Sequence, residues 1–206
     1  VFEYLSDPAK PVPYTSQTEG LTFTPREFMS DDQRHASRRP DVITFETDPL
    51  TQDVVLAGEI MARLKVAMTG TDADFIVKLI DVYPNNHPNY EHNAKNIVMA
   101  GYQQLVRHEV FRGRFRNGFD KPEPFKSGEV SSVDFPLQDI LHTFKKGHRI
   151  MIQIHSTWFP YIDRNPQKYV PNIYFAKPDD FQSATHRVFR SSAHPTNLKI
   201  GILPVM

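Results

Sequence analysis

The segment Ile60–Met68 reads IMARLKVAM, and its apolar residues recur at every second position along the run. Arg63 and Lys65 occupy positions between them. Successive side chains of a β-strand point to opposite faces, so this period of two predicts a half-buried strand. The segment therefore predicts a sheet that has one face on a hydrophobic core.

The flanking sequence adds further strands. Phe75–Tyr83 follows a turn-like link and is apolar on both faces, which predicts a central strand covered on both sides. Shorter or weaker strand patterns are found at Val1–Leu5, Val42–Thr47, Val54–Ala57, Tyr102–Phe111, Glu129–Leu137, Arg149–Ser156 and Leu198–Val205. Helical periodicity is scarce, and short helical turns are expected only at Asp179–Ala184, capped by Asp179 or Asp180, and at Leu137–Phe144. This pattern predicts an all-β fold: a β-sandwich, jelly roll or barrel.

Length and composition limit the possible functions. The 206 residues suit one domain, 1–206. The chain has no Cys, which excludes disulfides, a thiol nucleophile and thiolate metal ligands. Lys plus Arg and Asp plus Glu both number 24, so no net field attracts nucleic acid or an anionic membrane. Neither is expected as a partner, and the apolar runs are too short for a membrane span.

Two long irregular stretches, Pro8–Pro40 and Tyr83–Ala100, are rich in Pro, Asn and His. Loops of this length are usually functional, form interfaces or lie across a sheet. The sequence begins at Val1 in what is already a strand pattern, without an initiator Met. We therefore expect it to be part of a longer chain.

No nucleophile elbow is present. Hydrolases of the α/β type place their serine in a Gly-x-Ser-x-Gly turn, and no two of the nine glycines are four positions apart. Ser156 follows His155, but neighbours on a strand face opposite sides, so His155 is poorly placed as its base. Ser156 is interpreted as an ordinary strand serine, and no catalytic residue is assigned.

The nine histidines raise the question of a metal site. His87 and His92 flank an Asn-rich loop, and His148 and His155 bracket a strand, but none forms a His-Glu-x-x-His motif. Histidines at the surface or in loops are the favoured interpretation. No metal ligand and no cofactor are assigned.

Three aspartates, Asp72, Asp74 and Asp81, lie near the two ends of the Phe75–Tyr83 strand. Carboxylates beside loop carbonyls can hold structural Ca²⁺. Because no dense Asp/Asn/Gly loop is present, ion pairing with an arginine or capping of a turn is favoured.

Three arginines alternate along the sequence at Arg112, Arg114 and Arg116. If this segment is extended, they share one face, and Phe111 and Phe115 share the other. Arginines interleaved with aromatic residues can bind single-stranded nucleic acid. The balanced charge of the chain instead favours an intramolecular row of ion pairs or a domain interface.

The stretch Ser156–Pro166 contains the only Trp of the chain. Exposed aromatic rings could stack on sugars here, as in a carbohydrate-binding module; alternatively the Trp plugs the open end of the sandwich while Asp163 and Arg164 pair at the corner. The structural role is favoured, since Trp and Tyr usually anchor cores and interfaces. The candidate interface or cleft-lining residues are Trp158, Phe159, Tyr161, Asp163 and Arg164.

Several motifs in one order carry a family resemblance. They are Tyr4–Tyr14, Arg39–Thr47, Thr69–Phe75, Lys78–Pro84, Arg112–Arg116, Phe144–Ile150 and Trp158–Pro166. Together they resemble the C-terminal domain shared by X-prolyl dipeptidyl-peptidases, cocaine esterase, cephalosporin acylases and α-amino-acid ester hydrolases. The resemblance runs essentially from end to end and looks closest to the ester hydrolase and acylase branch.

The resemblance implies a jelly-roll sandwich, similar to galactose-binding domains, packed against an α/β-hydrolase domain and a helical cap in the same chain. It places the Ser-His-Asp triad upstream, so this domain would brace the catalytic domain and shape its cleft. A homo-oligomer and an extracytoplasmic location are weaker expectations. The alternatives are a carbohydrate-binding β-sandwich and, more remotely, a metallohydrolase built on the histidines.

Overall fold

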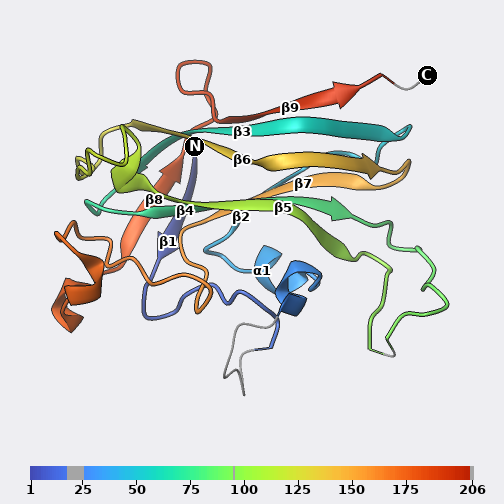
Figure 1. Cartoon of the computed structure of the whole chain (residues 1–206), viewed down its shortest axis with the longest axis horizontal. Coiled ribbons are helices and arrows are strands. Elements are labelled where there is room, and N and C mark those ends of the chain that lie inside the picture. The colour runs from blue at the N-terminus through green and yellow to red at the C-terminus, as the bar shows by residue number, and fades with distance from the viewer. Residues whose placement is uncertain (18–25, 95, 205–206) are drawn as a thin grey trace.

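The computed structural model, which describes residues 1–17, 26–94 and 96–204, contains two β-sheets packed face to face (Figure 1). One sheet has five strands in the order β1-β8-β3-β6, with β9 also paired to β3, and the other has four strands in the order β2-β7-β4-β5. All pairings between these strands are antiparallel. The strands are β1 (Phe2–Ser6), β2 (Ile43–Glu46), β3 (Val54–Met68), β4 (Asp74–Val82), β5 (Gln103–Arg112), β6 (Ser131–Phe144), β7 (Arg149–His155), β8 (Ala184–Val188) and β9 (Asn197–Leu203). The all-β, two-sheet fold class expected from the sequence is confirmed.

Strand β3 contains the segment that decides the fold. Its residues Ile60, Ala62 and Leu64 are completely buried, as their alternation predicts. β3 also incorporates Val54–Ala57, which the sequence pattern separates as a strand of its own. The two parts join at an irregularity in the pairing near Gly58, whose φ of 87° favours glycine.

Strand β4 is central, as expected, and every one of its residues is buried. Its inner face packs against the five-stranded sheet, and its outer face lies under a second layer that includes Tyr14, Phe28 and Trp158. Part of this layer is the irregular chain around the short helices η1 (Arg26–Met29) and α1 (Arg34–Ser37), below the sheets in Figure 1. The described parts of the stretch Pro8–Pro40 thus lie across a sheet; residues 18–25 are outside the described chain.

The helical turn expected at Leu137–Phe144 is wrong, because this segment is the second half of β6. The register of the β3–β6 pair shifts between Gly58 and Ile60, where Gly58 faces Ile140 and Ile60 faces Leu137. One extra residue in β6 moves the buried positions to Leu137, Ile140 and Phe144. This spacing imitates the i, i+3, i+7 pattern of a helix.

The second expected helix is displaced. A 3₁₀ turn, η4 (Pro178–Asp180), comes earlier than Asp179–Ala184 and is followed by β8, which the sequence reading missed. Asp180 does cap the turn, since its Oδ2 accepts from the Lys177 backbone N–H at 2.9 Å. The expected strand Leu198–Val205 is β9, which ends at Leu203; Val205 lies outside the described residues. No helix within the described chain is long and apolar enough to cross a membrane.

Candidate domain interface

Ser156, the serine considered as a nucleophile, follows β7 and belongs to a buried hydrogen-bond chain. Its Oγ lies 2.7 Å from the Tyr4 hydroxyl and 3.0 Å from His186 Nδ1. His186 Nε2 lies 2.6 Å from Gln167 Oε1. An amide oxygen only accepts, so His186 carries its proton on Nε2 and accepts from Ser156 at Nδ1. The Tyr4 hydroxyl then donates to Ser156.

The chain of hydrogen bonds is closed to solvent. Ser156 is 4% exposed and His186 is 1% exposed. Burial lowers the pKa of His186 to about 4, so the imidazole is neutral at neutral pH. Burial also raises the pKa of Tyr4, which stays protonated. Because Ser156 Oγ already has two partners and no access, this serine–histidine pair is structural.

His155 and Ser156 have different surroundings. His155 Nδ1 lies 2.7 Å from the Thr157 carbonyl oxygen, and its ring faces Trp158 at a centroid distance of 6.3 Å. Burial lowers the pKa of His155 as well. The expectation that His155 cannot serve Ser156 agrees with this geometry. The partner of Ser156 is His186, which lies in β8. The alternation of Ala184, His186 and Val188 was the sequence pattern that could have predicted this strand.

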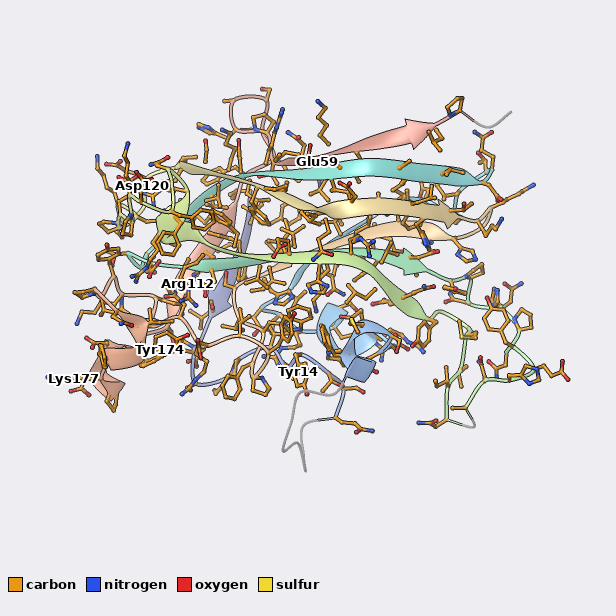
Figure 2. The ribbon with its side chains drawn as sticks, viewed as in Figure 1. Tyr14, Glu59, Arg112, Asp120, Tyr174 and Lys177 are labelled. Atoms are coloured by element: carbon orange, nitrogen blue, oxygen red, sulfur yellow. The ribbon has the colours of Figure 1, made fainter. Side chains whose placement is uncertain are left out.

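The arginine row forms ion pairs, which confirms the intramolecular alternative. Arg112 makes a bidentate contact to Asp74 at 3.1 and 3.2 Å, Arg114 binds Asp72 in a buried pair, and Arg116 reaches Glu123 at 3.7 Å. The extended geometry expected for this segment is wrong after Arg112, because Gly113–Phe115 is a 3₁₀ turn, η2. Figure 2 shows Arg112 at the end of β5.

The aspartates considered for calcium are engaged by other side chains of the chain itself. Asp72 and Asp74 bind the arginines just described. Asp81 accepts from His148 Nδ1 at 2.8 Å and from His142 Nε2 at 2.9 Å. Within the described ranges, no three His, Asp or Glu side chains gather in an arrangement suited to a metal ion. The contacts therefore favour ion pairing at Asp72 and Asp74, and hydrogen bonding at Asp81, over coordination of a metal ion.

Trp158 is the centre of the second, outer core. It is completely buried, and its ring contacts Phe28, His108 and Tyr161 edge-on. Lys78 Nζ, also buried, lies 4.3 Å from the centre of the Trp158 ring. A sugar cannot stack on this ring, so the carbohydrate-binding alternative loses its main platform and is not supported.

Lys78 is held beneath the outer layer. Its Nζ donates to Gln33 Oε1 at 3.0 Å, a contact between β4 and the residue that precedes α1. Burial lowers the pKa of Lys78 to about 7. Its cross-strand neighbour His108 has a pKa lowered to about 4, first by burial and then by the charge of Lys78. The polar groups of this layer serve the packing of the long loop on β4.

The other candidate residues lie at the surface. Phe159, Tyr161, Asp163 and Arg164 are exposed. Tyr161 stacks on Tyr14 at a centroid distance of 6.4 Å. The expected Asp163–Arg164 pair is not found among the ion pairs of the described residues; Arg164 donates instead to the Pro8 carbonyl at 3.0 Å.

Residues 172–183 complete this surface and were missed in the sequence. Tyr174 and Phe175, in the 3₁₀ turn η3 (Ile173–Phe175), are 75% and 81% exposed. Figure 2 shows Tyr174 and Lys177 at the outer end of this projecting segment. The sequence feature that could have indicated these exposed rings is a Tyr-Phe pair in an irregular stretch between two prolines.

We call this surface the aromatic rim and define it as Phe159, Arg164, Tyr174, Phe175 and Phe181. The Arg164 guanidinium lies 5.4 Å from the ring centres of both Phe159 and Phe181. Two hollows of about 410 and 190 Å³ adjoin the rim, and Arg164 and Phe181 line both. The rim thus combines exposed aromatic area with one oriented cation and two depressions.

The fold and these contacts define a class of protein: a β-sandwich domain whose buried polar groups hold its architecture and whose exposed features suit contact with another protein surface. The particular family follows from comparison with known proteins. Residues 5–199 match the X-Pro dipeptidyl-peptidase C-terminal non-catalytic domain, and the chain belongs to this family. The resemblance seen in the sequence is confirmed.

Individual relatives agree with this assignment. The chain is 31% identical over 200 residues to cocaine esterase from Rhodococcus sp. (strain MB1 Bresler), a match of 97% of this chain and 32% of that protein. An aminopeptidase structure from a marine sediment Thaumarchaeota archaeon is 43% identical, with a TM-score of 0.89 over 98% of this chain and 33% of that one. An α-amino acid ester hydrolase structure gives the same identity and TM-score over 98% and 32%. The chain thus spans about a third of the length of these relatives.

Proposed function

We propose that the chain is the C-terminal, non-catalytic domain of a longer serine hydrolase that cleaves esters or amides, and that it braces the catalytic part of that enzyme. Three relatives that are about three times longer, an esterase, an aminopeptidase and an ester hydrolase by name, support this proposal. In the longer protein a serine would be acylated with a histidine as base, and water would resolve the acyl-enzyme. An α/β-hydrolase domain and its cap would be the partners within the chain.

The observation that carries the proposal is the aromatic rim. Surface rings as exposed as Tyr174 and Phe175 are normal singly, but a cluster of them marks an interaction site. Protein interfaces are enriched in Tyr, Phe and Arg, all of which the rim contains. The Arg164 guanidinium lies over the rings of Phe159 and Phe181, so its side chain has less conformational freedom than that of an ordinary surface arginine.

The proposed role is to position the catalytic domain and its cleft. Small displacements of catalytic groups matter, because a misplacement of about 1 Å can lower a rate about 10²-fold. A rigid sandwich that covers apolar surface of the hydrolase domain would limit such displacement. The rim residues would therefore affect turnover of the longer enzyme without touching its substrate.

The experiment uses the longer protein with Tyr174→Ser and Phe175→Ser combined. We expect a lower melting temperature and a reduced kcat/KM toward an amino-acid ester. The matched control is Phe119→Ser, which removes a ring that is 80% exposed but lies outside the rim. If the rim variant behaves like the control, the rim does not dock the catalytic part.

A second measurement tests the non-catalytic assignment of this chain. The 206 residues alone should hydrolyse no p-nitrophenyl ester above background. Hydrolysis that Ser156→Ala abolishes would contradict the assignment. A second copy of the chain is another possible occupant of the rim, and the mass of the longer protein in solution, with and without the rim substitutions, distinguishes the two.

A further inference from the structure

A groove of about 500 Å³ opens between the two sheets, away from the aromatic rim. It lies between β2, at one end of the four-stranded sheet, and β9 and β1 of the five-stranded sheet. The apolar residues that line it are Phe2, Phe45, Ile150, Ile152, Ile154 and Leu198. No residue of the rim is among those that line the groove.

The groove is an opening into the main hydrophobic core. Ile154 belongs to that core, and Ile150, Ile152 and Leu198 pack against it while remaining partly exposed. β2 has only four residues and is the end strand of its sheet, so this edge of the four-stranded sheet is short. Apolar side chains of the core are therefore accessible along the unclosed side of the sandwich.

The Arg190 side chain lies at this opening, and within the described residues its charge is not neutralised by an ion pair. Its guanidinium lies 5.0 Å from the centre of the Phe45 ring and 5.5 Å from that of Phe2. Within the described chain, its side chain makes no ion pair or hydrogen bond. Glu46, which also lines the groove, is already paired with Arg149 at 3.3 Å. Two aromatic rings thus orient a guanidinium that has all of its N–H donors available for a carboxylate.

We infer that the groove receives a segment of the longer chain that inserts apolar side chains between the sheets and places an Asp or Glu carboxylate on Arg190. The inference rests on the proposed function, since it requires a longer chain. The matching family is a C-terminal domain, so the remainder of the protein would precede it. Phe2, in the first strand, forms one wall, and a chain entering the domain would pass the groove. The apolar lining of the groove matches the apolar side chains of such a segment, and the charge of Arg190 matches its carboxylate.

The test exploits the absence of cysteine from the chain. In the longer protein, Leu198→Cys places a thiol in the groove, and Lys199→Cys, the next residue of β9, places one on the opposite, exposed face of the strand. Maleimide labelling of each site is followed by mass spectrometry of its peptide. A groove filled nine-tenths of the time should slow labelling of Leu198→Cys at least about tenfold relative to Lys199→Cys. Equal rates would overturn the inference.

A charge variant tests the role of Arg190. Arg190→Glu should raise the labelling rate at Leu198→Cys about tenfold and leave that at Lys199→Cys unchanged, whereas Arg190→Lys should keep most of the protection. Circular dichroism of each variant verifies that the sandwich is intact. If Arg190→Glu leaves the protection unchanged in a folded protein, no carboxylate is bound there and the inference fails.

The outcomes separate this inference from the proposed function. Rim substitutions that impair the longer enzyme, together with an accessible groove, would retain the proposed function and reject the segment. Protection of Leu198→Cys that appears only when an apolar carboxylate such as phenylacetate is added would identify a free ligand, and would also reject the segment. Protection without additive, lost in Arg190→Glu, supports it.

Discussion

We expect the stability of the native chain to rise with pH above neutrality, and Lys78→Met to remove this rise. Lys78 is completely buried, and burial lowers its pKa from 10.5 to about 7. The unfolded chain keeps this proton until pH 10.5, so between these two values it binds more protons than the folded chain. The unfolding free energy therefore rises with pH across this window.

The magnitude follows from the two pKa values. One pH unit corresponds to about 1.4 kcal/mol, so Lys78 contributes a slope of that size and about 5 kcal/mol over the whole window. Methionine keeps the length of the side chain and cannot titrate. It also leaves Gln33 Oε1 without its donor, which lowers stability by about 1–3 kcal/mol at every pH. The pH dependence of the unfolding free energy therefore reports the buried amine of Lys78, whereas the constant loss from Gln33 does not.

The assay is urea unfolding of both proteins between about pH 7.5 and 9.5, below the titration of tyrosine. The difference in unfolding free energy between native chain and variant should grow by about 1.4 kcal/mol per pH unit. Lys126→Met, which removes an exposed lysine, should show no such growth. Parallel curves for the native chain and Lys78→Met would refute the reasoning, because a buried neutral amine must produce the slope.

Three further changes test the cores and the buried network. The pKa of His186 is about 4 in the folded chain and 6.5 in the unfolded chain, so its contribution to the unfolding free energy is lost as the pH falls from 6.5 toward 4. In urea titrations, His186→Gln should make this acid-induced loss of unfolding free energy smaller by about 3 kcal/mol. Trp158→Ala should lower the unfolding free energy by about 3–5 kcal/mol, followed by circular dichroism, since a buried indole leaves a cavity; a loss below 1 kcal/mol would contradict the outer core. Arg114→Met leaves Asp72 buried without its cation and should destabilise by about 3–5 kcal/mol, and adding Asp72→Leu should recover most of this in thermal unfolding.

The parts of the fold predicted from the sequence are those set by local periodicity. The alternation in Ile60–Met68 and the uniform apolarity of β4 need no knowledge of the rest of the chain, and both predictions are confirmed. The failure at Leu137–Phe144 has a definite cause: a bulge opposite Gly58 shifts the pattern by one residue. A bulge is a property of a pair of strands, so one strand alone does not reveal it.

The site was less predictable, because its contacts join residues far apart in the sequence. The ion pairs of the arginine row could be anticipated from charge balance, but Ser156 meets His186 only through the packing of β7 and β8. Burial of Trp158 depends on a loop more than a hundred residues earlier in the chain. The exposed rings at Tyr174 and Phe175 follow no periodic pattern, and their outward position is set by the turn η3.

The buried polar groups that imitate a catalytic site also fix the base of the aromatic rim. Gln167, bonded to His186, donates through Nε2 to the Ser6 and Gln182 carbonyls at 2.8 and 2.9 Å. It thereby joins the end of β1 to Gln182, near the C-terminal end of the projecting segment 172–183. The backbone at Gln167 passes so close to Gly70 that a Cβ there would lie 2.4 Å from its carbonyl oxygen. A docking surface anchored in this way loses less conformational entropy when it meets a partner. We therefore expect the buried serine–histidine pair to contribute to the proposed interface through rigidity rather than through catalysis.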